Sequence, residues 1–188
     1  MSFFPFSSTN SHRSASTVTP QNKTQRSHGQ VLETLFQNFD FDLEQVSDTI
    51  DPILTAQSRC EITSLYIQGI VSNGTAFLCT NINTEHAIEV TSRNSSWLIG
   101  KSSHCTISVP HSEISPRHAV IGYQSNHGFF ITDLGSNNGT WVNRRPLEPH
   151  QRYFLQDGDL IELGCLQVEF FLESFGLSMS SYEDETRY

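Results

Sequence analysis

The chain has 188 residues, 36% of them hydrophobic and 16% charged, which is enough for one sizeable core with extensions. Its net charge of −9 argues against a general nucleic-acid binder, because such proteins carry a basic stripe. No run of apolar residues approaches the roughly 20 that a membrane span needs, and the start of the chain lacks the pattern of a secretory signal. We therefore expect a cytoplasmic protein with no membrane span and no nucleic-acid partner.

The four cysteines, Cys60, Cys79, Cys105 and Cys165, form no C-x-x-C pair. This usage is ordinary for a chain in a reducing compartment, so we expect buried structural thiols. Disulfides and metal ligation are the less favoured alternatives. The histidines show no metal-ligand spacing either, and we expect no metal and no cofactor.

Residues 1–30 hold eleven Ser or Thr, two Pro and no Asp or Glu. Such a stretch buries too little apolar surface to offset the entropy of ordering, so we expect a disordered arm. The following residues, 31–51, carry six acids and no base, and this change of sign marks a boundary near residue 30.

A helical segment is expected over residues 31–58. Apolar side chains recur there at steps of three and four, which predicts one helix, or two joined near residues 40–42. They are Leu32, Leu35, Phe36, Phe39, Leu43, Val46, Ile50 and Ile53. Packing of this apolar stripe on the neighbouring domain is the simplest interpretation. Self-association or partner binding through residues 31–54 is the alternative.

From Ser64 onward the pattern indicates strands. Ser64–Val71 and Thr75–Ile82 are rich in β-branched and aromatic residues, and the Asn73-Gly74 pair between them is a strong hairpin signal. We therefore expect a β-hairpin extension over residues 59–85 that packs on a sandwich at 86–173, followed by a flexible tail at 174–188. Short strand-like runs recur through the sandwich region, at Ala87–Thr91, Trp97–Ile99, Thr106–Val109, Ala119–Tyr123, Phe129–Asp133, Arg152–Phe154, Leu160–Leu163 and Leu166–Leu172.

Four motifs follow one another in this half of the chain. They are WLIGKS at 97–102, ISPRHAVI at 114–121, DLGSNNGTWVN at 133–143 and LQDGDLIELG at 155–164. In order and spacing they closely resemble the forkhead-associated (FHA) family, over about residues 86–173. The resemblance implies a mainly β chain with an FHA-type sandwich of antiparallel strands. It also implies that loops at one end of the sandwich bind phosphothreonine peptides.

The resemblance also implies the residues of the binding site. Lys101 stands where the family most often has an arginine on the phosphate, and Ser115 stands where a serine hydroxyl donates to the phosphate. Asn137 occupies the position of a second polar residue near the phosphothreonine. Asn138 matches the asparagine that holds the ligand backbone.

The sequence departs from the family's pattern at two places. Lys101 can neutralise a phosphate but lacks the bidentate fork of an arginine. Pro116 follows the serine and offers no donor. Arg117, Arg144 and Arg145 lie nearby in sequence, and we expect them to raise the local positive potential. Of these three, Arg117 is our candidate for the binding site.

Five further residues are expected to shape the site. The family's histidine, here His118, braces the loops beneath the ligand. Gly139 belongs to a tight Asn-Gly turn, and side chains such as those of Asp133 and Asn143 bind nearby backbone and stiffen loops. Gly100, at the end of a strand, completes this structural set.

The sequence thus predicts a phosphothreonine-peptide binding module that acts in Ser/Thr kinase signalling or phospho-dependent complex assembly. Its partner would be a phosphothreonine-containing protein, and Thr17, Thr19 and Thr24 in the arm are candidate kinase acceptor sites. The alternative is a phosphate-independent assembly protein that uses the sandwich and the N-terminal helices as docking surfaces. No enzyme is expected, since the chain has no P-loop, paired-carboxylate motif or nucleophile elbow.

Overall fold

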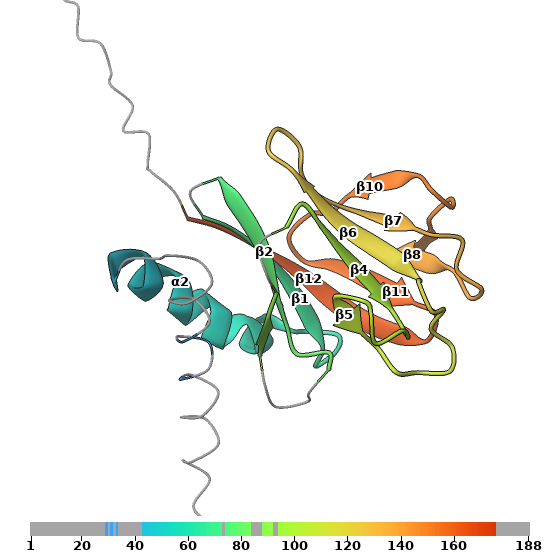
Figure 1. Cartoon of the computed structure of the whole chain (residues 1–188), viewed down its shortest axis with the longest axis horizontal. Coiled ribbons are helices and arrows are strands. Elements are labelled where there is room, and N and C mark those ends of the chain that lie inside the picture. The colour runs from blue at the N-terminus through green and yellow to red at the C-terminus, as the bar shows by residue number, and fades with distance from the viewer. Residues whose placement is uncertain are drawn as a thin grey trace, which may run out of the picture.

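The computed structural model describes residues 43–72, 74–83, 88–91 and 94–175, together with Gly29, Val31 and Glu33. Two β-sheets pack against each other in these residues, and helix α2 lies beside one of them (Figure 1). The expected arm at 1–30 lies outside the described residues except for Gly29, and the expected tail at 174–188 lies outside them except for Ser174 and Phe175, which belong to β12. In the part that the structure describes, no helix is both long and apolar enough to cross a membrane.

The helical elements are α2 (Leu43–Thr55) and a 3-10 turn, η1 (Ala56–Arg59). The strands are β1 (Tyr66–Ser72), β2 (Thr75–Thr80), β3 (Glu89–Val90), β4 (Ser96–Gly100), β5 (Ile107–Ser108), β6 (Ala119–Gln124), β7 (Gly128–Asp133), β8 (Thr140–Val142), β9 (Arg145–Pro146), β10 (Arg152–Phe154), β11 (Asp159–Leu163) and β12 (Leu166–Phe175).

The larger sheet has the strand order β3-β2-β1-β12-β11-β8-β9, and the smaller one β10-β7-β6-β4-β5. Most neighbouring strands are antiparallel, as expected, but β1 runs parallel to β12 and β4 runs parallel to β5. Both sheets are therefore mixed. The alternation of inward side chains in each sheet buries one common core, in which Trp97, Phe129 and Phe170 are the largest side chains.

The hairpin of β1 and β2 is continuous with the larger sheet, because β1 pairs along its whole length with β12. Ile67 and Leu78 from this hairpin belong to the same buried cluster as Trp97. We therefore propose that the folding unit begins before β1 rather than at residue 86.

Helix α2 and η1 lie on the outer face of the larger sheet (Figure 1). Ile53 of α2 is fully buried and shares a second apolar cluster with Ile70 and Phe77 from β1 and β2. Arg59 of η1 forms ion pairs with Asp157, at 2.7 Å, and Glu173, at 2.8 Å. The described part of the helical segment therefore packs on the sandwich, while self-association through residues 31–54 stays a prediction.

The chain between η1 and β1 is anchored by a buried carboxylate. Glu169 of β12 accepts hydrogen bonds from the backbone N–H groups of Glu61, Ile62 and Thr63. Burial acts to raise the pKa of Glu169, but these three bonds outweigh it and hold the pKa below its usual value.

All four cysteines are described, and each is a free thiol. Cys79 and Cys105 are buried, as expected, and Cys60 is half-buried. Cys165 departs from the expectation, because it lies in the exposed turn between β11 and β12. A turn of two residues has no interior in which a thiol could be covered.

Candidate functional site

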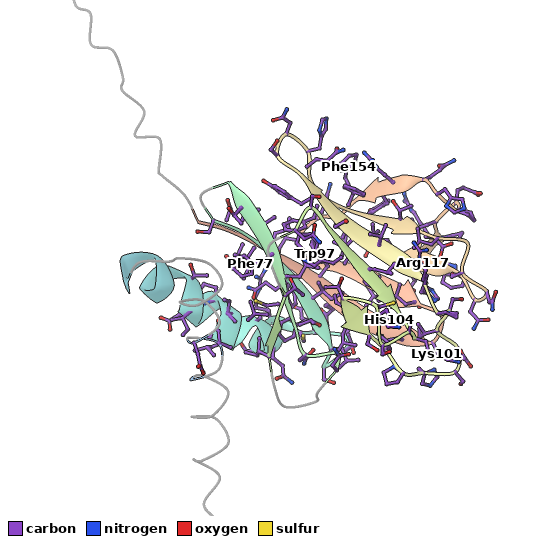
Figure 2. All side chains as sticks on the ribbon, viewed as in Figure 1. Phe77, Trp97, Lys101, His104, Arg117 and Phe154 are labelled. Carbon is purple, nitrogen blue, oxygen red and sulfur yellow. The ribbon has the colours of Figure 1, made fainter. Side chains whose placement is uncertain are left out.

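Three loops meet at the end of the sandwich that lies away from α2. They connect β4 to β5 (residues 101–106), β5 to β6 (109–118) and β7 to β8 (134–139). Figure 2 shows the labelled side chains of Lys101, His104 and Arg117 at this end. Hydrogen bonds join the loops to one another, so their side chains are held at fixed positions.

Ser115 is the residue at which the three loops meet. Its carbonyl accepts the backbone N–H of Lys101 at 2.9 Å, and its hydroxyl oxygen accepts the backbone N–H of Asn137 at 3.0 Å. The residue is only 7% exposed. Within the described residues the hydroxyl hydrogen has no acceptor, so it remains available to a ligand.

Gly100 allows the close approach of two of these loops. A Cβ atom at this position would lie 2.4 Å from the carbonyl oxygen of Pro116. The same carbonyl accepts the backbone N–H of Ser102 at 3.2 Å. A larger residue at position 100 would push the loop of Lys101 away from that of Ser115.

His118 lies beneath the loops and is fully buried. Its Nδ1 accepts the backbone N–H of Ser115 at 3.1 Å, and its Nε2 lies 3.0 Å from the carbonyl oxygen of Gly139. These partners assign the neutral tautomer with the hydrogen on Nε2. Burial lowers the pKa of His118, although the Gly139 carbonyl and the Asp133 carboxylate act in the opposite direction. Its contact is with the backbone nitrogen of Ser115 rather than the hydroxyl, so this pair is not arranged as nucleophile and base.

Asp133 shapes the loop between β7 and β8. One carboxylate oxygen accepts the backbone N–H groups of Gly135, at 2.8 Å, and Ser136, at 3.0 Å. The other accepts the hydroxyls of Ser136, at 2.6 Å, and Thr140, at 2.7 Å. Burial acts to raise the pKa of Asp133, yet these bonds outweigh it and the pKa lies below its usual value. The loop is therefore closed around an ionised carboxylate.

Asn138 projects from the same loop and is exposed. Its side-chain nitrogen donates to the carbonyl oxygen of Glu113 at 2.8 Å. One amide hydrogen and the amide oxygen remain for a ligand. The next residue, Gly139, has a φ of 77°, which favours glycine. Glu113 was missed by sequence reasoning because a backbone carbonyl 25 residues away leaves no signal in the sequence.

Asn143 lies outside the three loops, in the turn between β8 and β9. Asn143 and Arg144 both have positive φ, 51° and 65°, and form the turn between β8 and β9. The Asn143 side chain donates to Asp159 at 2.7 Å and accepts the backbone N–H of Leu160 at 2.9 Å. The structure thus ties this turn to β11, and Arg144 and Arg145 are not brought into the bonding that joins the three loops.

The three loops form a basic region in an acidic chain. Lys101 and Arg117 are exposed, and neither forms an ion pair within the described residues. Glu113 is the single carboxylate in these loops, and Asp133 beside them is buried and fully hydrogen-bonded. A concentration of unpaired positive charge beside hydroxyl and amide donors suits an anionic group such as a phosphate.

Comparison with known families agrees with this fold. The sequence model of the FHA domain matches residues 97–164, which extend from β4 to the end of β11. The fold is the β-sandwich of that family. Residues 97–164 are therefore an FHA domain.

Several known proteins are similar to this chain. The FHA domain-containing protein PS1 of Arabidopsis thaliana is 37% identical over 68 residues, which cover 36% of this chain and 5% of PS1. The E3 ubiquitin-protein ligase rnf8-B of Xenopus laevis is 41% identical over 51 residues, 27% of this chain and 10% of the ligase. Thus the chain spans a small part of these relatives' length.

Two solved structures are among those similar to part of this chain. One, from a study of phosphothreonine-dependent FHA domain interactions, is 32% identical, with a TM-score of 0.37, and the match covers 44% of this chain and 80% of that one. The N-terminal FHA domain of Rad53p from S. cerevisiae, in complex with a phosphothreonine peptide, is 24% identical, with a TM-score of 0.39, over 47% of this chain and 80% of that one.

Proposed function

We propose that this chain binds phosphothreonine peptides through Lys101, Ser115, Asn137 and Asn138. The observation that carries the proposal is the geometry of Ser115. Its oxygen is held by the Asn137 N–H and its backbone by Lys101 and His118, so the hydroxyl group is held in place for donation to a ligand. A preorganised donor of this kind loses little entropy when an anion binds.

Three of these residues, Lys101, Ser115 and Asn138, have distinct tasks in this proposal. A phosphothreonine carries a charge of about −1.5 to −2 at neutral pH and three acceptor oxygens. The Lys101 ammonium neutralises part of that charge, and the Ser115 hydroxyl donates a hydrogen bond to the phosphate. Asn138, fixed by Glu113, holds the peptide backbone with the rest of its amide group. Arg117, which is exposed next to Pro116, adds positive potential rather than a direct contact.

We further propose that this binding serves Ser/Thr kinase signalling or phospho-dependent complex assembly in the cytoplasm, and that the chain is not an enzyme. The contact between His118 and the backbone nitrogen of Ser115 supports a binding role, since it leaves the hydroxyl without a base.

The test is a binding measurement on the full chain. A phosphothreonine peptide library first identifies a ligand, which is then compared by calorimetry in its phosphothreonine, phosphoserine and unmodified forms. We expect tight binding of the first form alone. Ser115→Ala and Lys101→Ala should each weaken it by about 10- to 100-fold, as expected for loss of a hydrogen bond to a charged group. Arg144→Ala, on the turn tied to β11, is the matched control and should bind normally.

Equal affinity for the phosphorylated and unmodified peptides would contradict the proposal. It would favour instead the phosphate-independent assembly function, which the donor-free Pro116 supports. Pro116 has no N–H, and its carbonyl is an acceptor as the phosphate oxygens are, so this residue offers a phosphate no hydrogen bond.

A further inference from the structure

The outer face of the smaller sheet carries an aromatic surface on β7 and β10, which we call the β10 surface. Phe154 is 40% exposed, and its ring centre lies 5.6 Å from that of His127 and 6.1 Å from that of Phe130. The Arg152 guanidinium lies 4.6 Å from the centre of the Phe130 ring. Figure 2 shows Phe154 projecting from β10, far from α2.

The strand beside this surface has a free edge. Among the described strands, β10 is at the end of its sheet and pairs with β7 alone. The Leu155 N–H donates to the carbonyl oxygen of Phe129. In an antiparallel pair, successive residues point their backbone N–H and C=O groups alternately toward and away from the neighbouring strand. The backbone groups of Arg152 and Phe154 therefore point away from β7. Such an edge can accept one more extended segment through main-chain hydrogen bonds.

The charge around the β10 surface is positive. Next to it lies a hollow of about 400 Å³, lined by Ser96, Val120, Phe130, Thr132, His150 and Arg152, without a carboxylate. Arg152 has no ion-pair partner within the described residues. In a chain with a net charge of −9, this hollow offers an acidic segment a cation that no carboxylate of its lining opposes.

We propose that the β10 surface binds the segment of this same chain that follows β12, residues 176–188, as an extended strand along the edge of β10. This segment begins with apolar side chains at Leu177 and Met179. It then carries Tyr182 and three consecutive acids, Glu183 to Glu185. Its apolar part suits the Phe154 and Phe130 rings, and its acids suit Arg152.

The position at which β12 ends favours this occupant. Glu173 and Ser174 line a second hollow, of about 360 Å³, together with His127 and Leu155. The end of β12 therefore borders the same hollow as His127, one of the three rings of the β10 surface. Glu183 lies eight positions after Phe175, and at about 3.3 Å per extended residue this length of chain spans roughly 26 Å. Because the segment is covalently attached, its effective concentration is about millimolar, and a weak contact suffices.

The experiment is a charge swap in the full-length chain, followed by amide NMR and hydrogen exchange. In the native chain we expect slowed exchange for residues 177–185. Arg152→Glu should abolish this slowing and shift the amide signals of Phe130 and Phe154. Reversal of the three acids to lysine should do the same, and the two changes combined should restore it. Arg144→Glu, an exposed arginine on another turn, is the matched control and should change nothing.

Two outcomes would overturn the proposal. One is fast exchange of residues 177–185 in the native chain. The other is slowed exchange that disappears on dilution, because the occupant would then come from a second copy. The proposal does not rest on phosphopeptide binding, whose residues lie in the loops around Ser115, and affinity for a phosphothreonine peptide should be equal in all four variants.

Discussion

The backbone N–H of Asn137 donates a hydrogen bond of 3.0 Å to the hydroxyl oxygen of Ser115, across 22 residues of sequence. This bond joins the loop after β7 to the loop before β6. It also holds the serine hydroxyl oxygen in place. The candidate site is therefore formed before any ligand arrives, and its affinity depends on a few side chains whose replacement gives clear predictions.

Replacing Lys101 with arginine should strengthen binding of a phosphothreonine peptide. An arginine can donate two parallel hydrogen bonds to a phosphate, whereas the lysine ammonium acts as a point charge. We expect Lys101→Arg to tighten binding by about three- to tenfold and Lys101→Met to weaken it by at least about tenfold. Calorimetry with one peptide measures both. Unchanged binding by the methionine variant would show that Lys101 does not contact the phosphate.

Two glycine substitutions can distinguish an effect on peptide binding from an effect on the stability of the sandwich. A Cβ at position 100 would meet the Pro116 carbonyl at 2.4 Å, and a Cβ at position 122 would meet the Phe130 ring at 2.2 Å. Both Gly100→Ala and Gly122→Ala should cost about 1–3 kcal/mol of stability through overpacking. Only Gly100→Ala should also weaken peptide binding by the folded protein, because only that contact sets the distance between Lys101 and Ser115. Thermal unfolding and binding, measured on the same samples, distinguish the two effects.

Asp133→Asn should destabilise the loop between β7 and β8. The carboxylate accepts four hydrogen bonds, and an amide has only one oxygen to accept them. We expect a loss of about 2–4 kcal/mol in the free energy of unfolding, measured by urea denaturation. Thr140→Val, which removes one of the four bonds and keeps the shape, should lose about 1 kcal/mol. Equal losses in the two variants would argue against a shared network.

His118 should make stability sensitive to mild acid. Its folded-state pKa lies below the ordinary 6.5, so the folded chain binds fewer protons than the unfolded chain. The contribution of neutral His118 to the free energy of unfolding is fully present above about pH 6.5, and it is lost as the pH falls through the lowered pKa. Protonation would place a hydrogen on Nδ1, opposite the Ser115 N–H. We expect the melting temperature to fall between pH 7.5 and 5.5 in the native chain. In His118→Gln this fall should be smaller, and in His127→Gln, which changes an exposed histidine, it should persist.

The strands of the sandwich were predictable from local patterns. Trp97–Ile99 and Ala119–Tyr123 lie in β4 and β6, because each run alternates buried and more exposed side chains against one core. Strand β9 was missed. The turn before β9 is Asn143-Arg144, and both residues have positive φ. Such a turn is usually recognised by a glycine, and here an arginine stands in that place. The parallel pairing of β1 with β12 was also beyond local reasoning, since nothing in either strand specifies a partner a hundred residues away.

The candidate site was predictable only in part. The order of the motifs named Lys101, Ser115 and Asn138, and the structure places all three in loops at one end of the sandwich. Their roles toward a phosphate stay predictions until binding is measured. The supports for the site, by contrast, are backbone groups such as the Glu113 carbonyl and the Gly139 carbonyl. Every residue has such groups, so a sequence cannot show which of them will be used.

The parallel pair of β1 and β12 sets the order in which the chain can complete its fold. Tyr66 pairs with Glu169, and Ser72 pairs with Phe175. During synthesis the hairpin of β1 and β2 leaves the ribosome long before its neighbour in the sheet exists, and closing so large a loop is slow. The edge of β1 therefore stays unpaired until the chain has been synthesised as far as residue 175. We expect nascent chains that end before β12 to be the stage at which this protein most needs a chaperone.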